Sequence, residues 1–127
     1  MTIYLIEDDD IYAEFIMRSL KQNSAYKIEM FGTAEDCLSA LKSDQLPDAF
    51  IADYRLPGKT GIELYDIVKA KLKSENKFIM MSALDDGNLV LSFIKKGVRD
   101  YVIKDDTVID SLKAILEGNE DEYYLFN

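Results

Sequence analysis

The sequence predicts an α/β fold of the doubly wound type, in which five parallel strands alternate with five helices. Two observations support this prediction: short apolar runs recur along the chain, and stretches with helical spacing of apolar residues lie between them. Strands buried on both faces of a parallel sheet are continuously apolar, and parallel neighbours are joined by right-handed helical crossovers. Since 127 residues make one domain of ordinary size, we expect a single folded unit.

Five segments have the composition of strands. In residues 26–31 the polar residues Lys27 and Glu29 stand between apolar neighbours, and this alternation is expected of an edge strand. The other four segments are continuously apolar and are expected to be buried on both faces: residues 3–6, 49–52, 78–81 and 101–103.

Five stretches between these runs have apolar residues at helical spacing. The clearest covers residues 34–41, where apolar residues recur at i, i+3, i+4 and i+7 and Thr33 stands in the N-cap position. Gly97 and Gly118 follow the last two stretches, where helix-ending glycines are common. The apolar positions are Phe15, Ile16 and Leu20; Ala34, Cys37, Leu38 and Leu41; Leu64, Val68 and Leu72; Leu89, Val90, Phe93 and Ile94; and Val108, Leu112, Ile115 and Leu116.

The charge of the chain argues against anionic partners. The 24 acidic residues outnumber the 15 basic ones and give a net charge of −9, which repels nucleic-acid phosphates and acidic lipid headgroups. The apolar start at residues 3–6 is shorter than the core of a signal peptide, and no later run approaches membrane-spanning length. We therefore expect a cytoplasmic protein that binds neither nucleic acid directly nor membranes.

The scarcity of histidine and cysteine excludes several kinds of chemistry. The chain has no histidine and a single cysteine, Cys37, so a zinc or haem site has almost no ligands and an internal disulfide is impossible. Nucleophiles activated by histidine are excluded as well. Cys37 is expected to be a small core residue.

Polar residues stand where the apolar strands end. Glu7, Asp8 and Asp9 follow the first strand, and Asp53 ends the third. Ser82 and Lys104 end the fourth and fifth. Ligands in doubly wound folds bind at the carboxyl ends of the strands. Carboxylates pressed together there repel one another unless a cation lies between them, and Mg²⁺ suits such oxygen ligands.

This set of groups favours phosphoryl transfer. The carboxylate of Asp53 would attack in line, Lys104 and Mg²⁺ would neutralise the phosphoryl oxygens, and Ser82 would donate a hydrogen bond. A carboxylate is already a competent nucleophile, so the lack of histidine fits the reaction. We expect Asp9, one step beyond the acidic pair, to begin the following helix instead.

Four segments carry a resemblance to a known family. These segments are IYLIEDDD, PDAFIADYRLPGKTGIEL, FIMMSA and GVRDYVIK, and they follow one another in the order and at the spacings typical of that family. Over almost its whole length the sequence resembles a receiver domain of the response regulators of two-component signalling. The resemblance implies a flavodoxin-like (βα)5 fold with strand order 2-1-3-4-5. It also implies site roles: phosphorylation at Asp53, Mg²⁺ binding by Glu7, Asp8, Asp53 and the backbone carbonyl of Arg55, switching by Ser82 and Tyr101, and phosphate binding by Lys104.

The resemblance also implies partners and boundaries. A sensor histidine kinase or a histidine phosphotransfer protein would donate the phosphoryl group. The output surface, formed by the fourth helix, fifth strand and fifth helix, would then bind a downstream protein, an effector domain or a second copy of the chain. The chain would catalyse only its own phosphorylation and dephosphorylation, so we do not expect an enzyme. Residues 1–118 would form the domain, and residues 119–127 a tail that packs back or begins a linker.

Several alternatives stay open at this point. The first is a Mg²⁺-dependent phosphatase with an aspartyl intermediate, although Arg55 stands where its second acid is expected. The second is an interaction module that no longer accepts phosphate. Tyr101 is also explained by strand packing. Asp105 follows Lys104 where many receivers have proline, so we expect no cis peptide there, and Arg55 and Leu84 occupy positions that tune dephosphorylation in the family.

Overall fold

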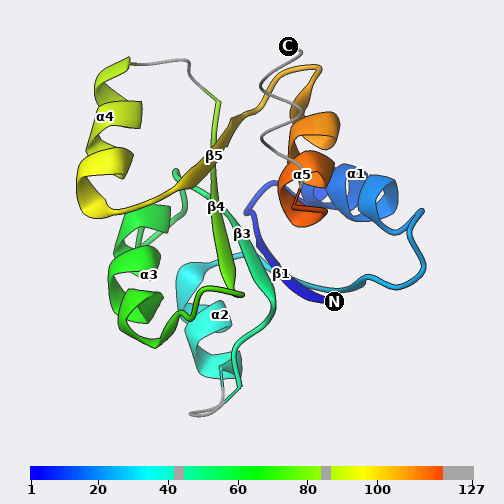
Figure 1. Ribbon diagram of the computed structural model, residues 1–127, viewed down its shortest axis with the longest axis horizontal. Coiled ribbons are helices and arrows are strands. Elements are labelled where there is room, and N and C mark those ends of the chain that lie inside the picture. Colours follow the sequence, from blue (N-terminus) through cyan, green and yellow to red (C-terminus); the bar gives the residue numbers. More distant parts are fainter. Residues whose placement is uncertain (42–44, 84–86, 119–127) are drawn as a thin grey trace.

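The predicted α/β fold is confirmed in a computed structural model that describes residues 1–41, 45–83 and 87–118. Five parallel strands form one sheet in the order β2-β1-β3-β4-β5, and helices alternate with them along the chain (Figure 1). The elements are β1 (Thr2–Ile6), α1 (Asp10–Leu20), β2 (Lys27–Phe31), α2 (Ala34–Ala40), β3 (Ala49–Asp53), α3 (Gly61–Val68), η1 (Lys69–Lys71, a 3₁₀ turn), β4 (Lys77–Ser82), α4 (Gly87–Lys96), β5 (Asp100–Ile103) and α5 (Val108–Leu116).

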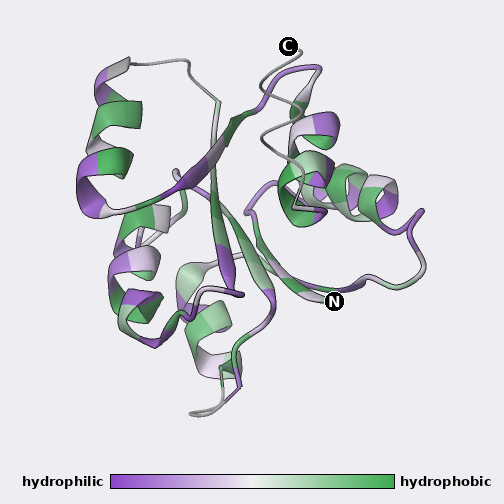
Figure 2. Ribbon diagram, in the orientation of Figure 1, coloured by the Kyte–Doolittle hydropathy of each residue, from purple (hydrophilic) through white to green (hydrophobic). Residues whose placement is uncertain are grey.

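The helices cover both faces of the sheet. Helices α1 and α5 lie on one side, and α2, α3 and α4 lie on the other (Figure 1). Side chains alternate along each strand, so in β3 Ile51 packs into the core under α1 and α5 while Phe50 packs into the core under α2, α3 and α4. The helices carry both hydrophobic and hydrophilic bands in Figure 2, as expected of helices with one buried face.

The position of each strand in the sheet agrees with its composition. All five residues of β3 are buried, because the strand lies between β1 and β4 and is covered on both faces. Within the described part of the chain, strand β2 pairs with β1 alone and leaves Lys27 exposed, which confirms residues 27–31 as an edge strand. Of the described residues, none belongs to a helix that has the length and apolar character needed to cross a membrane.

Most predicted helix features are confirmed. The side chain of Thr33 accepts a hydrogen bond from the Asp36 amide at 3.0 Å and caps α2. Gly97 and Gly118 follow α4 and α5 with φ values of 98° and 75°, which are left-handed conformations that favour glycine. Cys37 is fully buried.

Three apolar positions differ from the prediction. Phe15 and Ile94 are 48% and 54% exposed, because each lies at the margin of its helix stripe while its neighbour, Ile16 or Phe93, takes the buried position. Leu72 lies outside α3, because that helix ends at Val68 and tightens into η1 before the chain turns. Leu84 and residues 119–127 lie outside the described residues, so their roles and the domain boundary at residue 118 stay predictions.

A glycine at the start of α3 permits close contact between that helix and β3. A Cβ atom at Gly61 would lie 2.5 Å from the backbone oxygen of Asp53 and 2.8 Å from Sδ of Met80. Gly61 is not required by a left-handed backbone conformation, because its φ is not among the positive ones. Gly61 is required instead by the close approach of the α3 backbone to the end of β3, where Asp53 stands.

We predict that Gly61→Ala lowers the free energy of unfolding by about 1–3 kcal/mol, because the added methyl group overpacks this contact. Alanine is otherwise the better helix former, so propensity alone predicts the opposite sign. Urea unfolding measures the change. Gly32→Ala is the matched control, since a Cβ at Gly32 meets nothing within 4 Å. Equal stability of the two variants would contradict the proposed contact.

Candidate functional site

Three carboxylates meet at the carboxyl edge of the sheet. Glu7, Asp8 and Asp53 each offer an oxygen, and these oxygens lie within 4.8 Å of one another. Glu7 is 3% exposed and Asp53 is 6% exposed, whereas Asp8 is open to solvent. The structure therefore brings together the three acidic side chains that the sequence predicted as metal ligands.

The parallel ladder explains why these acids meet. Ile6 pairs with Ala52, so the next residues along these two strands, Glu7 and Asp53, lie side by side at the carboxyl edge of the sheet. The ladder continues past the strand end, because the Glu7 amide donates to the Phe31 carbonyl at 2.9 Å. Neighbouring strands cannot end here without placing the two acids side by side.

Lys104 supplies the positive charge between the buried acids. Its amide donates to the Ser82 carbonyl at 2.8 Å and thereby extends the pairing of β5 with β4 toward the site. Its ammonium donates to Oδ2 of Asp53 at 2.8 Å and also to Oε1 of Glu7. The side chain of Lys104 is only 14% exposed, so water screens these charge-assisted bonds weakly.

Burial shifts the protonation equilibria of this pair. Loss of hydration raises the pKa of Glu7 to about 7, although its hydrogen bond from Lys104 acts in the opposite direction. For Lys104, burial alone would lower the pKa, but the bonds to Asp53 and Glu7 outweigh it and the pKa is raised. Lys104 therefore stays charged at neutral pH, and Glu7 is the group that titrates near it.

Local hydrogen bonds fix the loops that carry the acids. Asp9 caps α1 by accepting from the amides of Ile11 at 3.0 Å and Tyr12 at 3.2 Å, which confirms its predicted role at the helix start. Its own amide donates to Oε2 of Glu7 at 3.2 Å. After β3, the Arg55 amide donates to Oδ1 of Asp53 at 3.3 Å. Both oxygens of Asp53 thus have a partner.

Two further predicted residues lie in β4 and β5. Ser82 ends β4 and is 4% exposed, and Tyr101 in β5 is half-buried against the core on the α2, α3 and α4 side. The switch roles of Ser82 and Tyr101, and the role of the Arg55 carbonyl as a ligand, stay predictions.

The acid after Lys104 already has a partner. Asp105 accepts from the amide of Thr107 at 2.9 Å and from its hydroxyl at 2.7 Å, and these bonds lower the pKa of Asp105. Its carboxylate is held in the turn that precedes α5.

One residue at the site was not predicted from the sequence. The ammonium of Lys104 lies 4.7 Å from the centre of the Tyr12 ring, on the first turn of α1. Its sequence position could have indicated this, because Tyr12 stands four residues after Asp8 on a helix that starts at the sheet edge.

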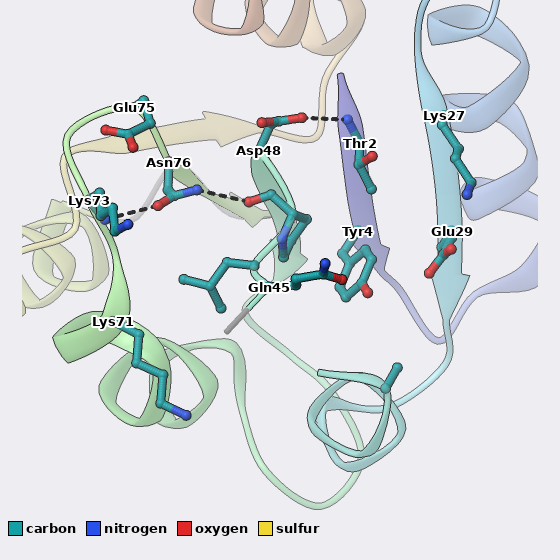
Figure 3. A pocket seen from close by; sticks show the side chains of 13 residues that line it. Thr2, Tyr4, Lys27, Glu29, Gln45, Asp48, Lys71, Lys73, Glu75 and Asn76 are labelled. Carbon is teal, nitrogen blue, oxygen red and sulfur yellow. Dashed lines mark hydrogen bonds between the residues drawn. The ribbon is translucent and has the colours of Figure 1, made fainter. Parts of the chain in front are cut away.

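A separate groove lies at the other edge of the sheet (Figure 3). It has a volume of about 940 Å³ and is bordered by the amino ends of the strands, including Thr2 and Lys27. Three lysines and three acidic residues line it, and several of its polar groups bond to one another, as Asp48 does to the Thr2 amide at 2.7 Å. The groove shares no residue with the carboxylate cluster.

Comparison with known proteins gives one consistent result. The sequence profile of the family described as the response regulator receiver domain matches residues 3–117. The chain is 32% identical over 114 residues to the chemotaxis protein CheY of Listeria monocytogenes, covering 86% of this chain and 93% of that protein. It is 26% identical over 113 residues to the probable transcriptional regulatory protein NarL of Mycobacterium tuberculosis, covering 87% of this chain. The chain spans about half of NarL, 51% of its length.

Solved structures agree on the fold. The receiver domain of Francisella response regulator 1452 matches with a TM-score of 0.79 at 22% identity, over 96% of this chain and 98% of that one. At this identity the match supports the fold alone, and the function has to be argued from the site.

We predict that, without divalent cations, stability falls as the pH rises from about 5 to about 7.5. Glu7 has a pKa of about 7 in the folded protein against 4.5 for the unperturbed group. The folded state therefore binds the extra proton between these values, and the stabilisation present below the lower pKa is lost as the pH passes the higher one. Since one pKa unit corresponds to about 1.4 kcal/mol, we expect a loss of about 2–3 kcal/mol in urea unfolding.

Glu7→Gln should remove most of this slope, whereas Glu14→Gln, at an exposed ion pair of α1, should retain it. Few other groups titrate in this range, since the chain has no histidine. An unchanged slope in Glu7→Gln would refute the assignment.

Proposed function

The chain belongs to the response regulator receiver domain family, and from this premise we propose that it accepts a phosphoryl group on Asp53 from a phosphohistidine. The donor would be a sensor histidine kinase or a histidine phosphotransfer protein. The observation that carries the proposal is the position of Asp53, which lies at the sheet edge between two further carboxylates and the ammonium of Lys104. Receiver domains are generally signalling modules rather than enzymes.

The donor set fits a Mg²⁺ ion. Glu7, Asp8 and Asp53 present only oxygen atoms, close enough together to share one cation, and one of the three is open to water. Mg²⁺ favours such a site, because it binds one or two carboxylates and keeps several waters. Glu7, Asp8, Asp53 and the backbone carbonyl of Arg55 would hold it. When bound, the ion supplies positive charge that offsets the negative charge of the carboxylates and the phosphoryl oxygens.

The residues of the chain have distinct roles in the transfer. A carboxylate oxygen of Asp53 attacks the phosphorus in line, an O–P bond forms, and the P–N bond to the donor imidazole breaks. The electron pair of that bond leaves with the imidazole nitrogen, so no general base on this chain is required. Lys104 offers its ammonium to a phosphoryl oxygen, and Ser82 would donate a hydrogen bond to another.

Phosphorylation would then change the output surface. Ser82 ends β4 and pairs with Ile103, two residues after Tyr101 in β5. Movement of Ser82 toward the phosphoryl group would be transmitted along this strand pairing to Tyr101. Leu91 and Ile94 are each 54% exposed on α4 and offer apolar contact area on this surface. We propose that the surface of α4, β5 and α5 binds a downstream protein, an effector domain or a second copy of the chain.

We predict that incubation with phosphoramidate and Mg²⁺ adds one phosphoryl group to the protein and that Asp53→Asn abolishes the addition. Intact-protein mass spectrometry measures the product. Asp110→Asn, an exposed acid on α5, is the matched control and should be phosphorylated normally. A folded wild-type protein that gains no phosphoryl group would contradict the proposed function. Rapid turnover of varied phosphate esters would instead favour a phosphatase.

We also predict that Mg²⁺ raises the melting temperature and that Asp8→Ala abolishes the increase. A ligand that binds only the folded state stabilises it by about 2.7 kcal/mol at a concentration of a hundred times its Kd. Asp10→Ala removes the same charge two residues away, outside the cluster, and should keep the response. An equal response of Asp8→Ala and Asp10→Ala would place the metal elsewhere.

A further inference from the structure

The ring of Tyr12 faces the reactive end of the site. The Lys104 ammonium lies 4.7 Å from the ring centre, within the range of a cation–π interaction. The ammonium itself is held by Glu7 and Asp53, so a single positive charge contacts two carboxylates and an aromatic face. Burial strengthens the attraction to the ring, because the side chain of Lys104 is only 14% exposed.

The acidic segment Glu7, Asp8 and Asp9 fixes the backbone of Tyr12. Asp9 accepts a hydrogen bond from the Tyr12 amide at 3.2 Å, and the amide of Asp9 donates to Glu7 at 3.2 Å. The ring of Phe15, one helical turn further on, lies 5.9 Å from the Tyr12 ring and supports it. The position of the ring is therefore coupled to the same loop that carries the acids.

The hydroxyl group of Tyr12 does not explain why this residue lies here. Among the described residues, Tyr12 Oη is the buried side-chain polar atom without a hydrogen-bond partner. A buried hydroxyl without a partner is destabilising, because it has lost its hydrogen bonds to water. The favourable contact that Tyr12 makes with the site is made by its ring face, which phenylalanine would also provide.

We propose that Tyr12 is a positioning residue, whose ring holds the Lys104 ammonium over the carboxylate cluster. This inference rests on the proposed function, because Lys104 must exchange a carboxylate partner for a phosphoryl oxygen when Asp53 reacts. The ring is uncharged and is attracted to the ammonium without requiring one hydrogen-bond direction. It keeps the ammonium in place while its hydrogen-bond partners change.

Two substitutions separate the ring from the hydroxyl group. Tyr12→Leu should slow phosphorylation by phosphoramidate about three- to tenfold, the range expected for a partly buried cation–π contact. Tyr12→Phe should stay within about twofold of wild type and be at least as stable, since it removes only the hydroxyl group. If Tyr12→Phe is slowed as much as Tyr12→Leu, the hydroxyl carries the effect and the proposal is wrong.

A spectroscopic measurement tests the same contact without phosphorylation. The ring current of Tyr12 should shift the ε-methylene protons of Lys104 upfield in the NMR spectrum. Tyr12→Phe should keep this shift and Tyr12→Leu should lose it. A Lys104 shift unchanged in Tyr12→Leu would overturn the proposal.

A double-mutant cycle distinguishes positioning from general packing. If the ring acts through the ammonium, the loss of stability in Tyr12→Leu should shrink when Lys104→Met is already present. Additive losses would mean that the ring only fills space and would overturn the proposal. Failure of the wild type to accept a phosphoryl group would refute the proposed function alone, because the NMR shift and the cycle would still decide the role of Tyr12.

Discussion

The repulsion between buried carboxylates at one edge of the sheet is the constraint on which the rest of the site depends. Parallel pairing of β1 with β3 places Glu7 beside Asp53, and both are nearly excluded from water. Two such charges are unfavourable together unless a cation joins them. Lys104 provides this cation from the end of β5, so the third side chain that the site needs comes from the opposite end of the chain.

Much of this arrangement could be predicted from the sequence, because the features that determine it are local. Continuous apolar runs locate the strands, and the residue after each run must lie at the carboxyl edge. The exposure of Phe15 and Ile94 could not be predicted. The spacing of apolar residues shows which face of a helix is buried, but not how wide the buried face is. The contact of Lys104 with Glu7 spans 97 positions in sequence and depends on the order of strands in the sheet.

The same contacts relate the resting structure to the proposed signalling role. A bound cation would compete with Lys104 for the oxygens of Glu7 and Asp53, and a phosphoryl group on Asp53 would offer Lys104 a new acceptor. Each event would change the partners of one ammonium group next to Ser82, where β4 and β5 end. The change of charge would therefore occur where the chain leaves β4 toward α4 and β5 toward α5.

Lys104 is the counter-charge to the buried carboxylates that would bind Mg²⁺. The most direct test is the Mg²⁺ dissociation constant of Lys104→Met, which removes the charge and keeps much of the side-chain volume, compared with that of the wild type at neutral pH by calorimetry. If the ammonium and the ion compete for the same oxygens, Lys104→Met binds Mg²⁺ more tightly than the wild type does. Equal or weaker binding by a folded Lys104→Met variant would contradict the account.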